Sequence, residues 1–293
     1  MSFEEQFFKV YRQGKTNQAQ PTAAIALLPE ETKRIAVINQ KGGCGKTTTA
    51  VNVSACLAEM GCRVLLVDLD PQAHATLGLG LRGDDLPVTI YHVLKPDGIP
   101  LMQAIQPTYH PNLKLAPANT LLASLQLELA DQPERERILR KRLEDVSPWF
   151  NFIFLDCPPS LNLLTLNALT AATHVMVPIQ THYLSLDGMR ELFKTIQLVR
   201  AEFNPDLEML GILPTLFDHR TRLNRAMLQT IREYFKGQVF DTVIRLNAAL
   251  TECPMVGQPV TRYAPAAHGA EDYRHLAEEL LQPNHQEHAQ APA

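Results

Sequence analysis

Hydrophobic residues occur along this chain in short unbroken runs that alternate with longer amphipathic segments. RVLLVDLD (63–70) and FNFIFLDCPPS (150–160) are apolar runs that contain acids near their ends, as is typical of parallel strands buried on both faces. TTTAVNVSACLAEMG (47–61) instead has a helical pattern and is closed by Gly61. The same criteria predict further strands at 34–40, 112–118, 174–180, 207–215 and 238–245, and further helices at 133–146, 162–172, 185–202, 221–236 and 269–282.

The order of these segments predicts the fold class. Strands that alternate with helices form βαβ units, so we expect an α/β protein with a single doubly wound, mostly parallel sheet flanked by helices. The pattern covers residues 31–282, which we expect to form one domain. Residues 1–30 are predicted to be a flexible extension, in which MSFEEQFFKVYRQ has apolar residues at helical spacing, and residues 283–293 a disordered polar tail.

Composition argues against several classes of protein. The 293 residues are 45% hydrophobic and 20% charged with a formal net charge of -4, so any contact with nucleic acid must come from a local patch. The apolar runs are too short for a transmembrane helix, and the N-terminus lacks the apolar core of a secretory signal. The five cysteines are odd in number and form no C-x-x-C pair, which favours reduced, buried thiols in the cytoplasm over disulfides or a metal centre.

A glycine-rich loop, NQKGGCGKTTTA (39–50), joins the first predicted strand to the first predicted helix. It nearly fits the phosphate-binding pattern G-x-x-x-x-G-K-[ST], but Gln40 stands where the first glycine belongs, and a second lysine follows it. Backbone N–H groups of such a loop surround an anion, Lys46 is expected to reach the β- and γ-phosphates, and the Thr47 hydroxyl to ligate Mg²⁺. The predicted nucleotide-binding residues here are Lys41, Gly42, Gly43, Cys44, Gly45, Lys46, Thr47 and Thr48.

Three acids lie at strand ends, where ligands bind in parallel sheets. Asp156 follows the apolar run FIFL and fits the Walker B role of holding Mg²⁺. Asp68 and Asp70 lie on the same face of the neighbouring strand, so one would support Mg²⁺ and the other would orient an attacking water. The pattern therefore predicts phosphoryl transfer to water, with Thr47, Asp68 and Asp156 as the metal-binding residues.

With these motifs the chain resembles the ParA/Soj branch of the ParA/MinD ATPases, the P-loop NTPases with a deviant Walker A loop. The resemblance runs from about Arg34 to Leu281. It implies a switch that binds ATP and Mg²⁺ and then forms a homodimer with two nucleotides between the subunits. The matching segments are NQKGGCGKTTTAVN, VLLVDLDPQAHAT, FIFLDCPPSLNLLTLNAL, VPIQTHYLSLDGM, FDHRTRLN, TVIRLNAALTECPMVGQPV and HGAEDYRHLAEEL.

The resemblance also implies roles for single residues. Lys41 matches the lysine that crosses the dimer interface to the partner's phosphates, and Gly42 matches the glycine packed at that interface. Asp70 falls where the family has an aspartate essential for hydrolysis. Asn247, with Arg245 beside it, matches the segment that contacts adenine. The catalytic residues implied in this way are Lys41, Lys46 and Asp70.

A basic segment at residues 218–236 contains five arginines and lysines against two acids. Such a local excess holds DNA phosphates through a salt-sensitive electrostatic attraction. In the family, the ATP-bound dimer binds DNA non-specifically, and Arg220 falls on the basic position of F-D-x-R-T. The predicted DNA-binding residues are Arg220, Arg222, Arg225 and Arg245.

The chain departs from the family pattern just after this segment. Where the family often shows P-R-N-x-R-L, Leu246 and Ala249 replace two arginines, one of them a DNA contact, and Arg245 would compensate from one position earlier. Two cargoes therefore stay open: chromosome or plasmid DNA with a ParB-like partner that stimulates hydrolysis, and a protein microcompartment or chemoreceptor array carried on the nucleoid by an adaptor.

Two other functions fit less well. A membrane-cycling division regulator would need a basic amphipathic helix at the C-terminus, which PNHQEHAQAPA (283–293) does not provide. A metabolic kinase would need an acceptor pocket, and no segment of the sequence indicates one. We therefore expect a nucleoid-associated ATPase of the cytoplasm that does not bind membranes.

Overall fold

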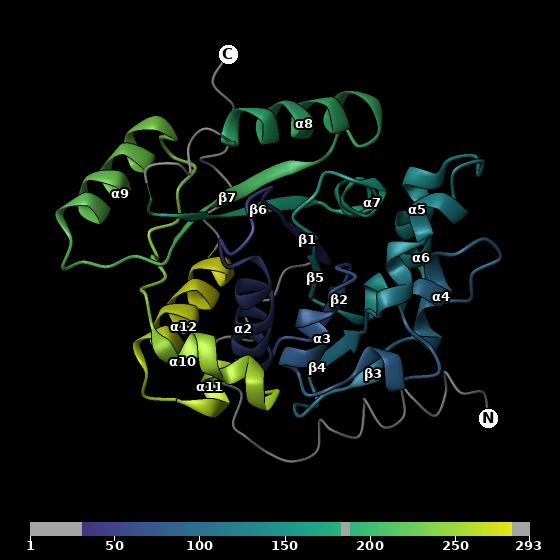
Figure 1. Cartoon of the computed structure of the whole chain (residues 1–293), viewed down its shortest axis with the longest axis horizontal. Coiled ribbons are helices and arrows are strands. Elements are labelled where there is room, and N and C mark those ends of the chain that lie inside the picture. The colour runs from purple at the N-terminus through teal and green to yellow at the C-terminus, as the bar shows by residue number, and fades with distance from the viewer. Residues whose placement is uncertain (1–30, 183–187, 283–293) are drawn as a thin grey trace.

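A seven-stranded sheet runs through the middle of the computed structural model, which describes residues 31–182 and 188–282 (Figure 1). The strand order is β3-β4-β2-β5-β1-β6-β7, and every pairing is parallel except that of β3 with β4. The predicted doubly wound sheet is therefore confirmed. The strands are β1 (Lys33–Val37), β2 (Val64–Asp68), β3 (Gln106–Pro107), β4 (Leu113–Ala116), β5 (Phe152–Asp156), β6 (His174–Gln180) and β7 (Glu208–Thr215).

Helices cover both faces of the sheet. Helices α2 and α12 pack side by side on one face, and α4, α6, α7 and α8 contribute to the apolar core on the other (Figure 1). The helices are α2 (Lys46–Glu59), α3 (His74–Gly78), α4 (Ile90–Leu94), α5 (Leu125–Glu128), α6 (Ile138–Glu144), α7 (Leu163–Ala171), α8 (Met189–Glu202), α9 (Arg222–Tyr234), α10 (Ala248–Glu252), α11 (Val260–Tyr263) and α12 (His268–Leu281).

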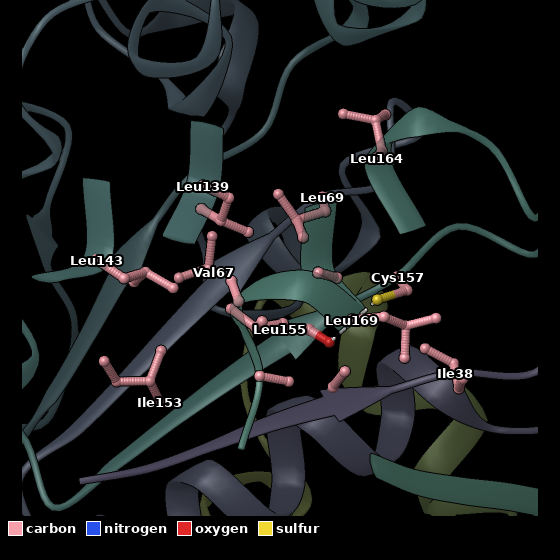
Figure 2. Packing of buried hydrophobic residues seen from close by; sticks show 14 of the residues in the cluster. Ile38, Val67, Leu69, Leu139, Leu143, Ile153, Leu155, Cys157, Leu164 and Leu169 are labelled. Carbon is pink, nitrogen blue, oxygen red and sulfur yellow. Dashed lines mark hydrogen bonds between the residues drawn. The ribbon is translucent and has the colours of Figure 1, made fainter. Parts of the chain in front are cut away.

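Alternation along each strand divides the core into two layers, because successive side chains point to opposite faces. Figure 2 shows the layer beneath α6 and α7, where Val67 of β2 and Leu155 of β5 lie near Leu139, Leu143 and Leu169. All five are fully buried, and each buried leucine stabilises the fold by roughly 1.5–3 kcal/mol. This packing fixes the central strands and therefore the positions of the residues at their ends.

The central strand β1 has β5 on one side and β6 on the other. Strands β5, β2 and β4 lie on one side of β1, and β6 and β7 lie on the other. The strand order therefore reverses next to β1. Ligands of doubly wound proteins bind beyond the carboxyl ends of the strands at such a point. The loop that follows β1 is the predicted phosphate-binding loop.

Residues 238–245 do not form the predicted strand. They make only isolated bridges, Ile212 with Val239 and Phe217 with Arg245. The N–H groups of Phe240 and Ile244 still donate to carbonyl oxygens of β7, but those of Asp241 and Thr242 donate to the Glu279 carboxylate of α12, and that of Arg245 to Asp272. The predicted strand is therefore wrong: only Phe240 and Ile244 of this segment are buried, and carboxylates of α12 take the place of some of the backbone acceptors of a ladder.

Other differences concern lengths and short elements. The predicted helix at 133–146 becomes a 3-10 turn at Arg135–Arg137 followed by α6, and the short helices α3, α4, α5, α10 and α11 were not predicted. The expected N-terminal helix and extension, the tail at 283–293 and part of the helix at 185–202 lie outside the described residues. All five cysteines are buried, as predicted. None of the helices within 31–182 and 188–282 is long and apolar enough to cross a membrane.

Candidate active site

The phosphate-binding loop joins β1 to α2 in the middle of the sheet. Gly43 and Gly45 have left-handed backbone conformations, with φ of 70° and 91°, which residues with a β-carbon rarely adopt. Gly45 is also the N-cap of α2, a helix of 14 residues. The loop therefore lies at the N-terminus of a long helix, where free N–H groups and the helix dipole favour a bound phosphate.

The two lysines of the loop have different surroundings. Lys46 is only 7% exposed, and its ammonium donates a hydrogen bond of 3.3 Å to the carbonyl oxygen of Lys41. The Lys46 side chain therefore lies folded over its own loop. Lys41 is half-buried, and its backbone N–H donates to the Asn39 side chain at 3.0 Å. Lys41 therefore lies nearer the surface than Lys46.

Side chains from the neighbouring strand ends bond to the loop. Gln180, the last residue of β6, donates to the Gly43 carbonyl oxygen at 2.7 Å, and Thr215, the last residue of β7, donates to the Cys44 carbonyl oxygen at 2.8 Å. We did not predict these two residues from the sequence. A usable signal existed, because each is a polar residue at the carboxyl end of a predicted parallel strand, the position where ligand sites form.

Asp68 and Asp156 end neighbouring strands and are paired in register, β2 with β5. Both are fully buried, and burial raises the pKa of both carboxyls. The nearby Asp68 carboxylate raises the pKa of Asp156 further. Because β5 also pairs with β1, Asp156 lies next to the strand that leads into the phosphate-binding loop, and Asp68 lies one strand farther away.

The two buried acids differ in their hydrogen bonds. Asp68 accepts from the Thr76 N–H at 2.8 Å, the Thr76 hydroxyl at 2.7 Å and the Asp70 N–H at 3.1 Å. By contrast, neither carboxyl oxygen of Asp156 has a hydrogen-bond partner in the part of the chain that the structure describes. A buried carboxylate without donors is costly, and a bound cation would remove that cost.

This contrast indicates which of the predicted metal-binding residues fit Mg²⁺. Asp156 has two oxygens to offer, and the Thr47 hydroxyl lies close enough to lower its pKa. Carboxylate and hydroxyl oxygens, together with phosphate oxygens, are the ligands that Mg²⁺ takes at nucleotide sites. The oxygens of Asp68 are already bonded, to Thr76 of α3 and to the Asp70 N–H in the turn before it, so Asp68 fits a direct role in metal binding less well.

Asp70 lies in the turn between β2 and α3 and is 8% exposed. Its carboxylate accepts the Gln72 N–H at 2.9 Å, and its own N–H is held by Asp68. It lies near enough to Asp156 to raise the pKa of that group. The fold therefore brings all three predicted acids to one edge of the sheet, beside the loop.

Comparison with known proteins identifies the family. The family model described as an AAA domain matches residues 32–209. The sporulation initiation inhibitor protein Soj of Bacillus subtilis is 44% identical over 248 residues, which is 85% of this chain and 98% of Soj. The chromosome-partitioning ATPase Soj of Thermus thermophilus is 45% identical over 255 residues, 87% of this chain and 98% of the relative.

This chain belongs to the Soj/ParA family of partition ATPases. Its predicted class, a P-loop ATPase that uses ATP and Mg²⁺, is the class of this family. Among solved structures, a cobyrinic acid a,c-diamide synthase of Mycobacterium smegmatis with bound ADP and magnesium has a TM-score of 0.75 and 38% identity, covering 85% of this chain and 94% of that one. MinD of Pyrococcus horikoshii, complexed with Mg-ADP, has a TM-score of 0.70 and 26% identity, covering 85% and 96%.

The residues that the family resemblance linked to adenine lie farther along the chain. Asn247 is the N-cap of α10, where its side chain accepts the Ala249 N–H at 3.0 Å. The Arg245 guanidinium donates to Asp272 at 2.9 Å and to Glu271 at 2.6 Å, and these carboxylates raise its pKa. Arg245 therefore links this segment to α12.

The three remaining predicted DNA-binding arginines lie together in the arginine segment, residues 218–225, at the start of α9. All three are exposed. Arg220 pairs with Asp218 at 2.9 Å, and Arg225 donates to the His219 carbonyl oxygen. The structure thus keeps Arg220, Arg222 and Arg225 together on the surface and directs the fourth predicted arginine toward the carboxylates of α12.

Proposed function

We propose that this protein is an ATP-gated dimeric switch that binds DNA non-specifically and partitions or positions chromosome or plasmid DNA. The observation that carries the proposal is the second lysine of the phosphate-binding loop. Lys46 is folded over its own loop, so Lys41, half-buried nearby, is not needed to hold the subunit's own phosphates. A role for Lys41 arises when a second subunit brings another γ-phosphate within its reach.

The residues divide the work of hydrolysis among them. Loop N–H groups and Lys46 bind and orient the phosphates, and Asp70 positions the attacking water. Thr47 and Asp156 would hold Mg²⁺, which neutralises charge that develops on the phosphates. Asp68 accepts a hydrogen bond from the Asp70 N–H, and so connects the residues that would hold Mg²⁺ to the residue that positions the water. Lys41 completes the partner's site across the dimer.

The arginine segment supports the DNA part of the proposal. Arg220, Arg222 and Arg225 are exposed on one short stretch of an otherwise acidic chain, and two copies joined in a dimer would double that local charge. Binding of this kind requires no base contacts. A ParB-like protein would then stimulate hydrolysis and release the dimer, so the protein would act in the cytoplasm on the nucleoid.

A cargo other than DNA, such as a protein microcompartment or a chemoreceptor array, is the second candidate. One observation favours it: Leu246 is 57% exposed at a position where the family often has arginine, so this surface is less basic than the family pattern. Filter binding of the ATP-loaded protein to random duplex DNA at low salt tests the shared step. Absence of ATP-dependent retention would reject DNA binding for both cargoes.

Substitution of Lys41 tests the dimer directly. Lys41→Ala is expected to keep ATP binding but lose ATP-dependent dimerisation and partner-stimulated turnover. Sedimentation velocity with a non-hydrolysable ATP analogue measures the dimer, and Lys194→Ala, which removes an exposed lysine on α8, is the matched control. If Lys41→Ala dimerises and turns over like the control, the dimer proposal is wrong.

A further inference from the structure

The carbonyl oxygens of the phosphate-binding loop are held by side chains outside the loop. Gly43 and Cys44 are consecutive residues, and their carbonyl oxygens accept from Gln180 and Thr215 at 2.7 and 2.8 Å. Gln180 and Thr215 are register partners in the β6–β7 ladder. Two neighbouring strand ends therefore present two donors, side by side, to two consecutive peptide groups.

The geometry of the peptide group gives this contact a consequence for ligand binding. A trans peptide is planar, and its C=O and N–H point in opposite directions. A hydrogen bond that fixes the Gly43 carbonyl therefore also fixes the N–H of Cys44, and one that fixes the Cys44 carbonyl fixes the N–H of Gly45. These N–H groups belong to the loop that surrounds the phosphates.

Glycine makes such an anchor necessary. Gly43 and Gly45 flank Cys44 and have φ of 70° and 91°. Because glycine moves between positive and negative φ at little cost, these peptide planes have little intrinsic resistance to rotation. An amide that rotates away from the phosphate must be restored on binding, which reduces affinity. External donors would keep both planes in the orientation that binds.

Thr215 holds the loop in two ways. It is 2% exposed, and its hydroxyl is the donor to Cys44. Its methyl carbon lies 3.6 Å from where a β-carbon on Gly45 would be, so it also packs beneath the first residue before α2. The backbone is held too, because the Thr181 N–H donates to the Thr215 carbonyl oxygen at 3.1 Å.

We propose that Gln180 and Thr215 are positioning residues that preorganise the Cys44 and Gly45 amides of the phosphate-binding loop for the nucleotide. Neither side chain is assigned a contact with the nucleotide. They act through the loop peptides, from the ends of β6 and β7. The proposal rests on the family's ATPase reaction and is independent of the DNA and dimer proposals, because it concerns nucleotide binding by a single subunit.

Substitutions that remove only the donor test this. Thr215→Val keeps the shape and removes the hydroxyl, whereas Thr215→Ser keeps the hydroxyl and removes the methyl. Titration of fluorescent methylanthraniloyl-ADP with Mg²⁺ into the full chain should show weaker binding by about 3- to 10-fold for Thr215→Val, the size of one lost hydrogen bond. Thr215→Ser should bind as the wild type does. KM for ATP should rise with kcat nearly unchanged, since substrate and transition state lose the contact equally.

Gln180→Met provides a second, independent test at a half-buried position. It should weaken ADP binding by a similar factor of about 3- to 10-fold. The control is Thr195→Val on α8, which removes a hydroxyl bonded to the Glu191 carbonyl oxygen away from the loop. Thermal unfolding without nucleotide should be unchanged in Gln180→Met, whereas the stabilisation added by ADP should fall.

The outcomes separate positioning from packing. Unchanged ADP binding in folded Thr215→Val and in Gln180→Met would overturn the proposal. Weaker binding in Thr215→Ser together with unchanged binding in Thr215→Val would also overturn it for Thr215, because the methyl and not the donor would then matter. If Thr215→Val does not fold, the comparison of ADP binding by Gln180→Met and by the control Thr195→Val decides. Weaker ADP binding in Gln180→Met alone supports the proposal.

Discussion

The phosphate-binding loop and the arginine segment both follow the carboxyl ends of parallel strands, but they are held by different kinds of contact. The loop is bonded by residues 137 and 171 positions away in sequence, Gln180 and Thr215. Arg220 instead pairs with Asp218, two residues away, and its side chain is 75% exposed. Contacts between residues far apart in sequence restrain a loop from outside, whereas local surface contacts leave side chains able to change partners.

The two regions meet at the end of β6. Thr181, which follows Gln180, donates its hydroxyl to Asn224 in the first turn of α9 at 2.8 Å. The same Asn224 oxygen accepts the Asp218 N–H at 3.0 Å and so holds the start of the arginine segment. The loop region and the exposed arginine segment are thus connected through Thr181 and Asn224. Substitutions in the loop should consequently have large effects, and those in the arginine segment small ones.

The largest effect is expected for Lys46→Ala. The ammonium is buried over the loop, and hydrogen bonds from a charged donor contribute roughly 1.5–3 kcal/mol each, so two phosphate contacts correspond to a loss of ADP and ATP affinity of about 100-fold or more. Isothermal titration calorimetry measures it, with Lys194→Ala as the control. A loss below about tenfold would contradict the view that the loop, and not the surface, carries nucleotide affinity.

The second effect concerns turnover. Asp70→Ala should lower kcat by about 10²- to 10⁴-fold, the usual contribution of a group that positions or activates water, while ATP-bound dimers still form. Steady-state ATPase assay and sedimentation velocity measure the two properties. The control is Asp85→Ala, an exposed acid at the end of the short 3-10 helix Gly83–Asp85 that follows α3. A monomeric Asp70→Ala protein at saturating ATP would show that the carboxylate serves assembly instead.

The fold was predictable because its central strands are unbroken apolar runs, and burial on both faces requires such runs. β6 was predicted with its observed bounds, 174–180. The strand predicted at 238–245 was wrong for a reason that lies outside the sequence of that segment. Gly211 leaves room for the Phe240 ring, since a β-carbon on that glycine would lie 2.7 Å from it, and α12 supplies the carboxylates that bond the backbone.

The site was predictable where a motif carries the chemistry, and unpredictable where tertiary contacts do. The loop and the three acids follow from their places at strand ends. Satisfaction of Asp68 by Thr76 could not be seen, because α3 is a helix of only five residues without a strong pattern. The pairing of Arg245 with Asp272 could not be predicted either, because these residues are 27 positions apart in the sequence.

A third, intermediate effect distinguishes the buried acids by stability without nucleotide. Asp156→Asn should raise the free energy of unfolding at about pH 8 by about 1.4 kcal/mol or more, the equivalent of one pKa unit, because it removes a buried carboxyl whose oxygens accept no hydrogen bond from residues 31–182 or 188–282. The pKa of Asp156 is higher in the folded state than in the unfolded state. The wild-type carboxyl therefore destabilises the fold more and more as the pH rises above the pKa of an ordinary aspartate. The stability gained by Asp156→Asn should consequently be smaller at about pH 5 than at about pH 8.

Asp68→Asn is the matched comparison. Its amide would turn a donor toward the Thr76 donors, so stability should fall by about 1–3 kcal/mol. Urea denaturation in the presence of a metal chelator measures both variants. If both acids responded alike, the inference that Asp156 faces a cation and Asp68 faces α3 would fail.

The smallest effects belong to the arginine segment. Arg220→Ala and Arg222→Ala should each weaken binding to random duplex DNA only a few-fold, and each lost phosphate contact should reduce the slope of log affinity against log salt by about 0.9.

Arg245→Gln should leave that slope unchanged, because its guanidinium is already held by Asp272 and Glu271. Fluorescence anisotropy of the ATP-loaded protein across a salt series measures all three. A reduced slope in Arg245→Gln would mean that this arginine leaves α12 on binding, and the compensation for Leu246 and Ala249 predicted from the sequence would then hold.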